Sequence, residues 1–200
     1  MNINENTVLP GFIAWLICSC NLGFNFGTIR PGGINKALKD NVGLTDDNGN
    51  SEGVLQVTDY RTADDASQPD SAAGNLGYTV TAQLGEFIGK ADPDLTSGSK
   101  FTTAAGTTAT PAFVMTLNQV TGNTTVTGPV DKDSTQATLE AGGPEAKVLG
   151  FNADEGSYGQ TTINYKAANA ASLTAPINVT AGSYDASVTW TLNAAASSNE

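Results

Sequence analysis

The pattern that most limits the fold of this chain is a run of alternating apolar and polar residues near its C-terminal end. Between residues 184 and 193, every second side chain is apolar. The apolar positions are Tyr184, Ala186, Val188, Trp190 and Leu192. Because successive side chains of a β-strand point to opposite faces, this segment is predicted to form a strand with one buried face.

Shorter segments of the same kind recur along the chain, each bounded by Gly, Pro, Asn or Asp. We expect further strands at residues 22–29, 54–60, 78–84, 113–117, 124–127, 136–140, 147–151, 161–166 and 175–180. A short helical turn is expected at residues 36–40. Many short strands with regular turn residues, and no regular exchange of strands with helices, predict an all-β fold. The class is an antiparallel β-sandwich or a barrel-like domain with long polar loops.

The chain length of 200 residues suits one domain of this class, and no linker separates two cores. We divide it into an apolar leader or atypical signal segment at residues 1–20, a β-domain at 21–196 and a short tail at 197–200. Val, Leu, Ile and aromatic residues are frequent enough to predict a packed core rather than a disordered polymer.

The N-terminal segment allows three interpretations. Residues 8–17 form a hydrophobic run that has the length of a signal-peptide core and is too short for a membrane-spanning helix. The sequence Ile17-Cys18-Ser19-Cys20 is typical of a lipoprotein cleavage box with Cys20 as the acylated residue. Residues 1–6 lack the basic start of a secretory signal. A lipidated leader, a truncated leader and a first strand entering the core are therefore alternatives.

Charge and composition disfavour several classes of function. The formal net charge is −11 and the 9 Lys and Arg residues are not clustered, so nucleic acid is not expected as a partner. The chain has no His and no recognisable nucleophile elbow, phosphate loop or metal-ligand spacing, so we expect no enzyme, cofactor or metal. Acidic clusters at 92–94, 131–133 and 154–155 match no recognised calcium loop.

Three separated patches of sequence are more specific in combination than alone. Trp190-Thr191-Leu192 lies close to the C-terminal end. Upstream, Asp59-Tyr60-Arg61 is followed by a polar loop and then by Gly77-Tyr78-Thr79-Val80, while residues 22–29 contain Phe-Gly-Thr. In this order, from about residue 21 to 196, the patches resemble the WxL domain, a cell-wall-binding module of low-GC Gram-positive bacteria. Tyr78 replaces the Trp of the family's first motif, and Ala196 stands where the family often has Pro.

The resemblance implies an extracellular surface protein that is held on peptidoglycan without a covalent link, alone or with other surface proteins of the same cluster. It makes Tyr78, Trp190, Leu192, Asp59 and Arg61 candidate binding residues. Strand parity favours a different role, in which the two aromatic rings fill the core and the Asp and Arg pair at a strand end. The alternative function is a structural or adhesive β-domain without affinity for the wall.

Overall fold

The computed structural model contains β-strands and no helix in the part of the chain that it describes. It describes residues 16–20, 23–39, 54–61, 77–89, 112–118, 136–152, 159–165, 167–177, 179 and 181–194. The strands are β1 (Leu16–Cys20), β2 (Lys36–Ala37), β3 (Val54–Asp59), β4 (Tyr78–Leu84), β5 (Ile88–Gly89), β6 (Val114–Asn118), β7 (Gln136–Glu140), β8 (Ala146–Phe151), β9 (Gly159–Asn164), β10 (Ala171–Thr174), β11 (Tyr184–Asp185) and β12 (Val188–Ala194). The predicted all-β class is confirmed.

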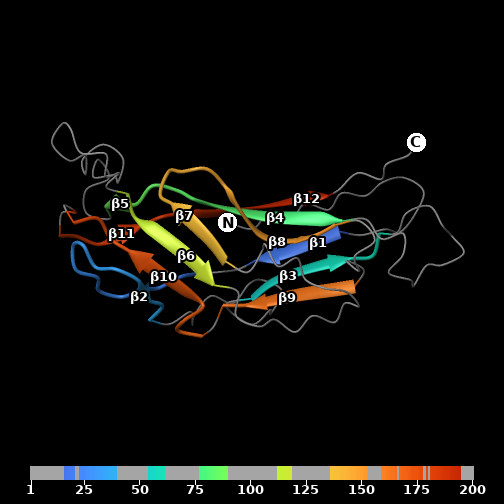
Figure 1. The fold of residues 1–200 in the computed structure, drawn as a ribbon, viewed down its shortest axis with the longest axis horizontal. Helices are drawn as coiled ribbons and strands as arrows, with labels where there is room; N and C mark the ends of the chain where they lie inside the picture. The colour runs from blue at the N-terminus through green and yellow to red at the C-terminus, as the bar shows by residue number, and fades with distance from the viewer. Residues whose placement is uncertain are drawn as a thin grey trace, which may run out of the picture.

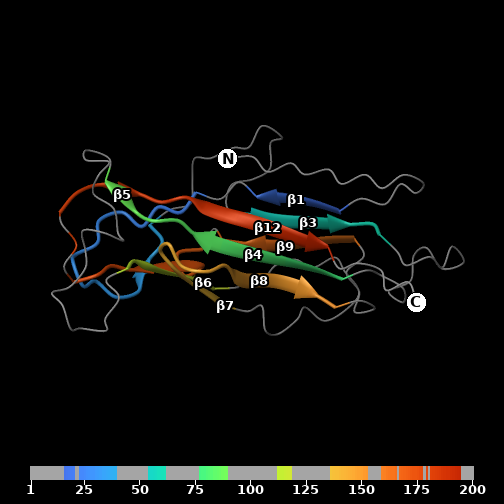
Figure 2. The ribbon, with the colours of Figure 1, turned by 90° about the horizontal axis from the view of Figure 1, so that it is seen from above.

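The described strands pair antiparallel in four sheets. Their strand orders are β1-β3-β9, β2-β10-β6-β7, β11-β5 and β12-β4-β8, and none of the four closes into a barrel within these strands. In Figures 1 and 2 the molecule is elongated, with β1-β3-β9 and β12-β4-β8 in one half and the other two sheets in the other. Over the described ranges, no helix is long and apolar enough to cross a membrane.

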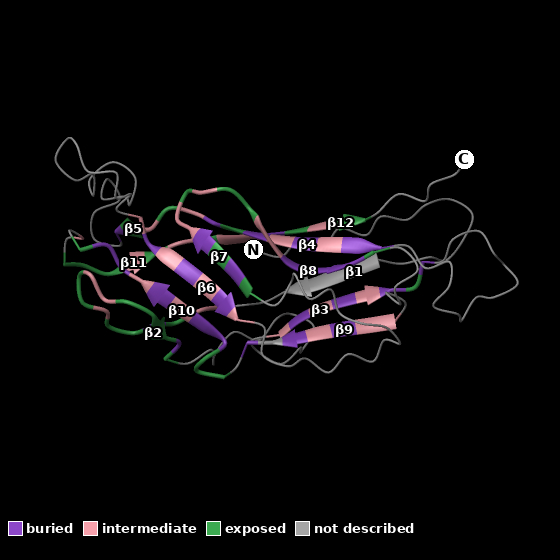
Figure 3. Cartoon of the chain, viewed as in Figure 1, coloured by how far each residue is buried: buried purple, intermediate pink, exposed green. Residues whose placement is uncertain are grey.

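One hydrophobic core joins the sheets. On β3 and β4, side chains alternate between buried and more exposed positions, as the sequence predicts for both strands. Figure 3 shows the same banding along β6 and β10. A bulge opposite Val80 and Thr81 breaks the alternation on β8, where Val148 and Leu149 are both buried. The inner faces of the sheets therefore form one continuous apolar layer.

Two predictions of local structure near the N-terminal end are wrong. Residues 23–30 form no regular strand apart from an isolated bridge at Asn25, whose Oδ1 accepts a hydrogen bond from the N–H of Gly27 at 2.8 Å. Within residues 36–40, Lys36 and Ala37 form strand β2 against β10 in place of a helical turn. In both cases hydrogen bonds, and not the local sequence pattern, determine the backbone conformation. For β2 the hydrogen-bonding partner is more than a hundred residues away in sequence.

The strand expected at residues 175–180 is also wrong, because the strand lies earlier, as β10. Beyond it, Pro176 has no N–H to donate to a ladder, although its carbonyl accepts a hydrogen bond from the N–H of Gly32 at 3.0 Å. The strand predicted at 124–127 and the three acidic clusters lie outside the described residues.

Strand β1 pairs with β3 and places Cys20 opposite Leu55. For residues 16–20 the structure thus has a strand, which was one of the three interpretations of this segment. Cleavage just before Cys20 would remove four of the five residues of this strand. A leader at residues 1–20 and lipidation of Cys20 remain predictions.

A β-bulge interrupts the pairing of β4 and β5 with β12 and β11. Between the opposite pairs Leu84–Val188 and Ile88–Asp185, the three residues that join β4 to β5 face the two residues that join β11 to β12. An extra residue of this kind bends the strand and shifts its alternation. The bulge therefore changes which side chains enter the interior.

The main effect of this bulge is on the position of Phe87. Strict alternation along β4 would place Glu86 inside and Phe87 outside, but Glu86 is exposed and Phe87 turns inward. The ring of Phe87 stacks on Phe113, with ring centroids 4.2 Å apart. Gly85 allows the close approach at the bulge, because a Cβ there would lie 2.6 Å from Ser187 Oγ. The N–H of Gly85 also donates to the carbonyl of Ser187 at 2.8 Å.

Candidate functional site

The two motifs that the sequence suggests lie on paired strands. Val80 of the first motif and Leu192 of the second are directly opposite each other on β4 and β12. Tyr78 and Trp190 lie four positions apart along the same ladder, which corresponds to about 13 Å. The tertiary structure thus brings together two motifs that are more than a hundred residues apart in sequence.

Both motif rings are buried, since Tyr78 is 1% exposed and Trp190 is 7% exposed. Tyr78 packs against Phe151 of β8, with centroids 5.3 Å apart. Trp190 packs against Tyr165, just beyond β9, at 6.3 Å. Leu192 is only partly buried and packs against the same core. Tyr78 and Trp190 therefore fill the core, and their ring faces are covered by protein.

Asp59 and Arg61 form a buried ion pair at the end of β3. Arg61 Nε donates to Asp59 Oδ1 at 2.9 Å, and Arg61 Nη2 donates to Asp59 Oδ2 at 2.8 Å. Arg61 Nη2 also donates to the carbonyl of Gly77 at 3.1 Å. Because Gly77 directly precedes Tyr78, the pair fastens the end of β3 to the start of β4. This geometry is that of a structural link.

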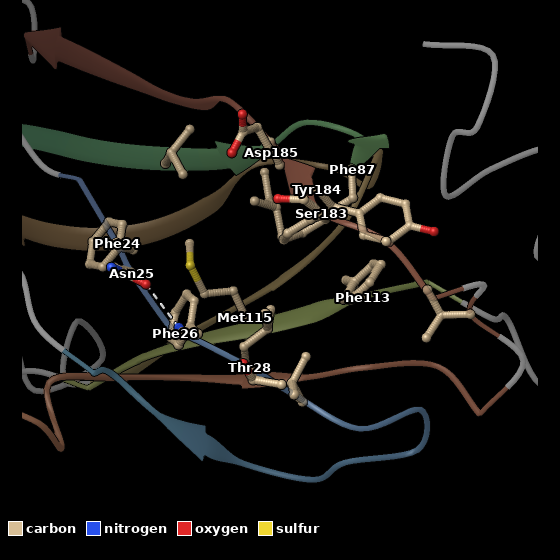
Figure 4. Close-up of a pocket in the computed structure, with 18 of the residues that line it drawn as sticks. Phe24, Asn25, Phe26, Thr28, Phe87, Phe113, Met115, Ser183, Tyr184 and Asp185 are labelled. Carbon is tan, nitrogen blue, oxygen red and sulfur yellow. Dashed lines mark hydrogen bonds between the residues drawn. The ribbon is translucent and has the colours of Figure 1, made fainter. Parts of the chain in front are cut away.

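A groove of about 1000 Å³ lies beside this core, in the half of the molecule that contains β5 and β11. We call it the aromatic groove. Its walls come from residues 23–29 and Pro31, from Phe113 and Met115 at β6, and from the chain around the bulge, including residues 181–186 and Val188. Figure 4 shows Phe24 and Phe26 on one side, Phe87 and Tyr184 on the other and Met115 between them. Its volume is within the range of small-molecule sites.

The rings of the groove form two groups. In the first, Phe87 stacks on Phe113 at 4.2 Å, and Phe113 lies 6.0 Å from Tyr184. In the second, Phe24 stacks on Phe26 at 6.5 Å. Phe113 and Phe26 are buried, whereas Phe24, Phe87 and Tyr184 are only half-buried. Each group therefore has a buried ring that supports rings with exposed surface.

The second group continues into the core through Tyr165. Phe24 meets Tyr165 edge to face at 5.9 Å, and Tyr165 packs against Trp190. Burial raises the pKa of the Tyr165 phenol well above its ordinary value of about 10, so the ring stays neutral at physiological pH. The motif Trp thus lies behind the rings of the groove and is connected to Phe24 through Tyr165.

Polar groups line the rim of the groove. Asn25, Thr28, Ser183 and Asp185 contribute side chains and are exposed. Of the described lining residues, only Asp185 carries a charge. An apolar floor with a few polar groups at its edge suits a ligand with apolar faces and hydrogen-bonding edges. No group of three or more His, Cys, Asp or Glu that could hold a metal occurs in the described ranges.

The aromatic groove was not identified from the sequence. Strand parity placed Phe113 and Tyr184 on inward faces, and both lie there. The alternation of apolar residues did not predict that Phe87 turns inward, because its inward position depends on the bulge. The one available signal was the presence of aromatic residues at Phe24 and Phe26 in the first patch and at Tyr184 upstream of the Trp motif.

Comparison with known protein families gives a match over most of the chain. The family described as WxL domain, surface cell wall-binding, matches residues 19–195. The match runs from the end of β1 past the end of β12, so it covers both motif strands and the aromatic groove. The chain matches no curated protein and no solved structure. The match over most of its length shows that the chain belongs to the WxL family of surface domains that bind the cell wall.

Proposed function

We propose that the domain attaches to the wall without catalysis, by taking a glycan segment of peptidoglycan into the aromatic groove. The observation that carries this proposal is the set of three half-buried rings, Phe24, Phe87 and Tyr184, which line a groove of about 1000 Å³. The C–H faces of sugar rings are apolar and their edges carry hydroxyl groups. Such ligands match a groove with an aromatic floor and a polar rim.

The charge of the protein supports an uncharged segment as the ligand. The chain carries a net charge of −11, and walls that bear teichoic acid are also anionic. Long-range attraction therefore cannot hold the domain on the wall. Stacking and hydrogen bonds must supply the affinity, and Asp185 is the one charged side chain among the described residues of the groove.

The test is retention of the purified protein on peptidoglycan freed of teichoic acid and protein. Tyr184→Ala removes a half-buried ring from the groove, and we expect retention to fall at least about tenfold. The matched control is Tyr60→Ala, because Tyr60 is an exposed tyrosine that lies outside the groove. Equal retention of both variants would show that the groove is not the site. Release of soluble fragments from peptidoglycan by the unmodified protein would contradict a non-catalytic role.

A second candidate function is docking to another surface protein, with or without wall binding. Ile34 and Ile177 are 75% and 79% exposed. They lie on neighbouring chain segments, since the N–H of Ala175 donates to the carbonyl of Gly33 at 2.9 Å. Exposed apolar residues on neighbouring segments can form part of a protein interface. An Ile34→Ser/Ile177→Ser variant that binds protein-free peptidoglycan normally but native walls weakly would favour this function.

A further inference from the structure

The outer face of the four-stranded sheet carries a second hollow, of about 380 Å³. We call it the polar face. Its side chains come from β2, β6, β7, β10 and the adjoining turns. The residues are Asn35, Ala37, Thr116, Asn118, Gln136, Thr138, Asn169, Ala171 and Ser172. Every one of them is uncharged, although the whole chain has a net charge of −11.

The strand register arranges these groups in rows. Thr116 of β6 lies directly opposite Ser172 of β10 on one side and opposite Thr138 of β7 on the other. Three hydroxyl groups therefore cross the sheet at intervals of about 4.8 Å. Two positions further along β6, Asn118 lies opposite Gln136, which adds a row of amides about 7 Å away.

Hydrogen bonds hold the amides in defined orientations. Gln136 Nε2 donates to Asn118 Oδ1 at 2.7 Å, and Asn118 Nδ2 donates to the carbonyl of Asn169 at 3.0 Å. An amide nitrogen has two N–H groups and an amide oxygen two lone pairs. Each of these bonds uses one, so both amides keep capacity for a ligand. Side chains held in place in this way lose little conformational entropy on binding.

We propose that the polar face is a separate binding site for an uncharged glycan chain. Rows of hydroxyl and amide groups can both donate and accept hydrogen bonds, as the hydroxyl groups of a sugar chain require. A polyanion would find no cation among these lining residues, because none is charged. The hollow crosses the face of the sheet from β2 to β7, whereas an extended peptide binds by backbone pairing along one strand edge.

This site lies on the opposite side of β6 from the aromatic groove. Phe113 and Met115 face the groove, whereas Thr116 and Asn118 face outward. One domain could therefore hold two glycan strands of a wall network, one on each side of the sheet. Two weak sites that act together give a retention much stronger than either alone.

The test uses soluble strands of N-acetylated chitin oligosaccharide, which have β-1,4-linked N-acetylated sugars and carry no charge. Thr116→Val/Thr138→Val removes two hydroxyl groups and keeps the branched shape that suits a strand. We expect the affinity for these strands to fall about five- to tenfold. Thr191→Val is the matched control, because Thr191 is an exposed strand threonine of another sheet. Circular dichroism and thermal unfolding verify that all variants are folded.

A second measurement uses the unmodified protein. In NMR titrations with the same strands, the side-chain amide signals of Asn118 and Gln136 should shift, and the inorganic polyanion polyphosphate should leave them unchanged. Unchanged amide signals with the glycan, or equal affinities of the double variant and the Thr191→Val control, would overturn the inference. The proposal for the aromatic groove is tested separately. If Tyr184→Ala loses binding and Thr116→Val/Thr138→Val keeps it, the groove is the binding site and the proposal for the polar face is wrong.

Discussion

The two halves of the molecule differ in how far their aromatic rings are exposed. We call the half with β1-β3-β9 and β12-β4-β8 the motif half, and the half with the aromatic groove the groove half. In the motif half, Tyr78 and Trp190 are covered by protein, and the Asp59–Arg61 pair is closed inside the core. In the groove half, aromatic rings are supported from below and keep part of their surface open. Tyr78, Trp190 and the Asp59–Arg61 pair are therefore part of the packed interior, whereas residues 23–29, from the first patch of the resemblance, line the groove.

Tyr165 connects the two halves, since its ring contacts Trp190 on one side and Phe24 on the other. Although this contact joins the halves, stability and binding should separate under mutation, because only the rings of the groove keep exposed surface for a ligand. Changes in the motif half should act on the free energy of unfolding, whereas changes at Tyr184 should act on wall retention. Each of the following predictions tests this division between residues for stability and residues for binding.

The largest effect is expected for Trp190→Ala. Removal of a buried Trp ring leaves a cavity and should lower the free energy of unfolding by about 3–5 kcal/mol. Urea denaturation followed by fluorescence or circular dichroism measures the change. Trp190→Phe, which keeps an aromatic ring, should cost less and should bind peptidoglycan as the unmodified protein does. If Trp190→Phe stays stable and loses wall retention, the motif ring contacts the ligand and the division of roles is wrong.

An intermediate effect is expected for Arg61→Lys. Lysine keeps the charge but cannot make the two parallel hydrogen bonds to Asp59 or, at the same time, reach the carbonyl of Gly77. The free energy of unfolding should fall by about 1–3 kcal/mol, with peptidoglycan retention unchanged at temperatures where the variant is folded. A variant as stable as the unmodified protein would show that the fork geometry is not needed to join β3 to β4.

The smallest effect is expected for Tyr165→Phe, and it depends on pH. The pKa of the phenol is raised in the folded state, whereas in the unfolded chain it is about 10. The folded state therefore keeps its proton above pH 10 while the unfolded state loses it, so stability falls as pH rises through this range. Below pH 10 the variant should differ by about 1 kcal/mol or less.

Thermal unfolding at a series of pH values between about 8 and 11 measures this contribution. The loss of stability at alkaline pH should be shallower in Tyr165→Phe than in the unmodified protein. Identical alkaline profiles would mean that this phenol does not contribute to the pH dependence. Retention on peptidoglycan at neutral pH should persist, because the ring that supports Phe24 is kept.

Alternation of apolar residues was sufficient to predict several strands, including β3, β4 and β7, because one face of each packs against the core. The parity of Asp59 and Arg61 likewise predicted that they could pair. The pattern failed at Lys36 and Ala37, where pairing with β10 determines the backbone. Such long-range pairing leaves no periodic signal in a segment of two residues.

By itself, the sequence determined the all-β class, the family and which faces of β3, β4 and β7 turn inward, because these depend on the period of two and on local motifs. Only the tertiary structure decided which inward rings are covered and which stay open. Phe87 enters the aromatic groove through a bulge that exists only when β4–β5 pairs with β12–β11. The polar face likewise arises from the register of separate strands, which no single segment of the chain encodes.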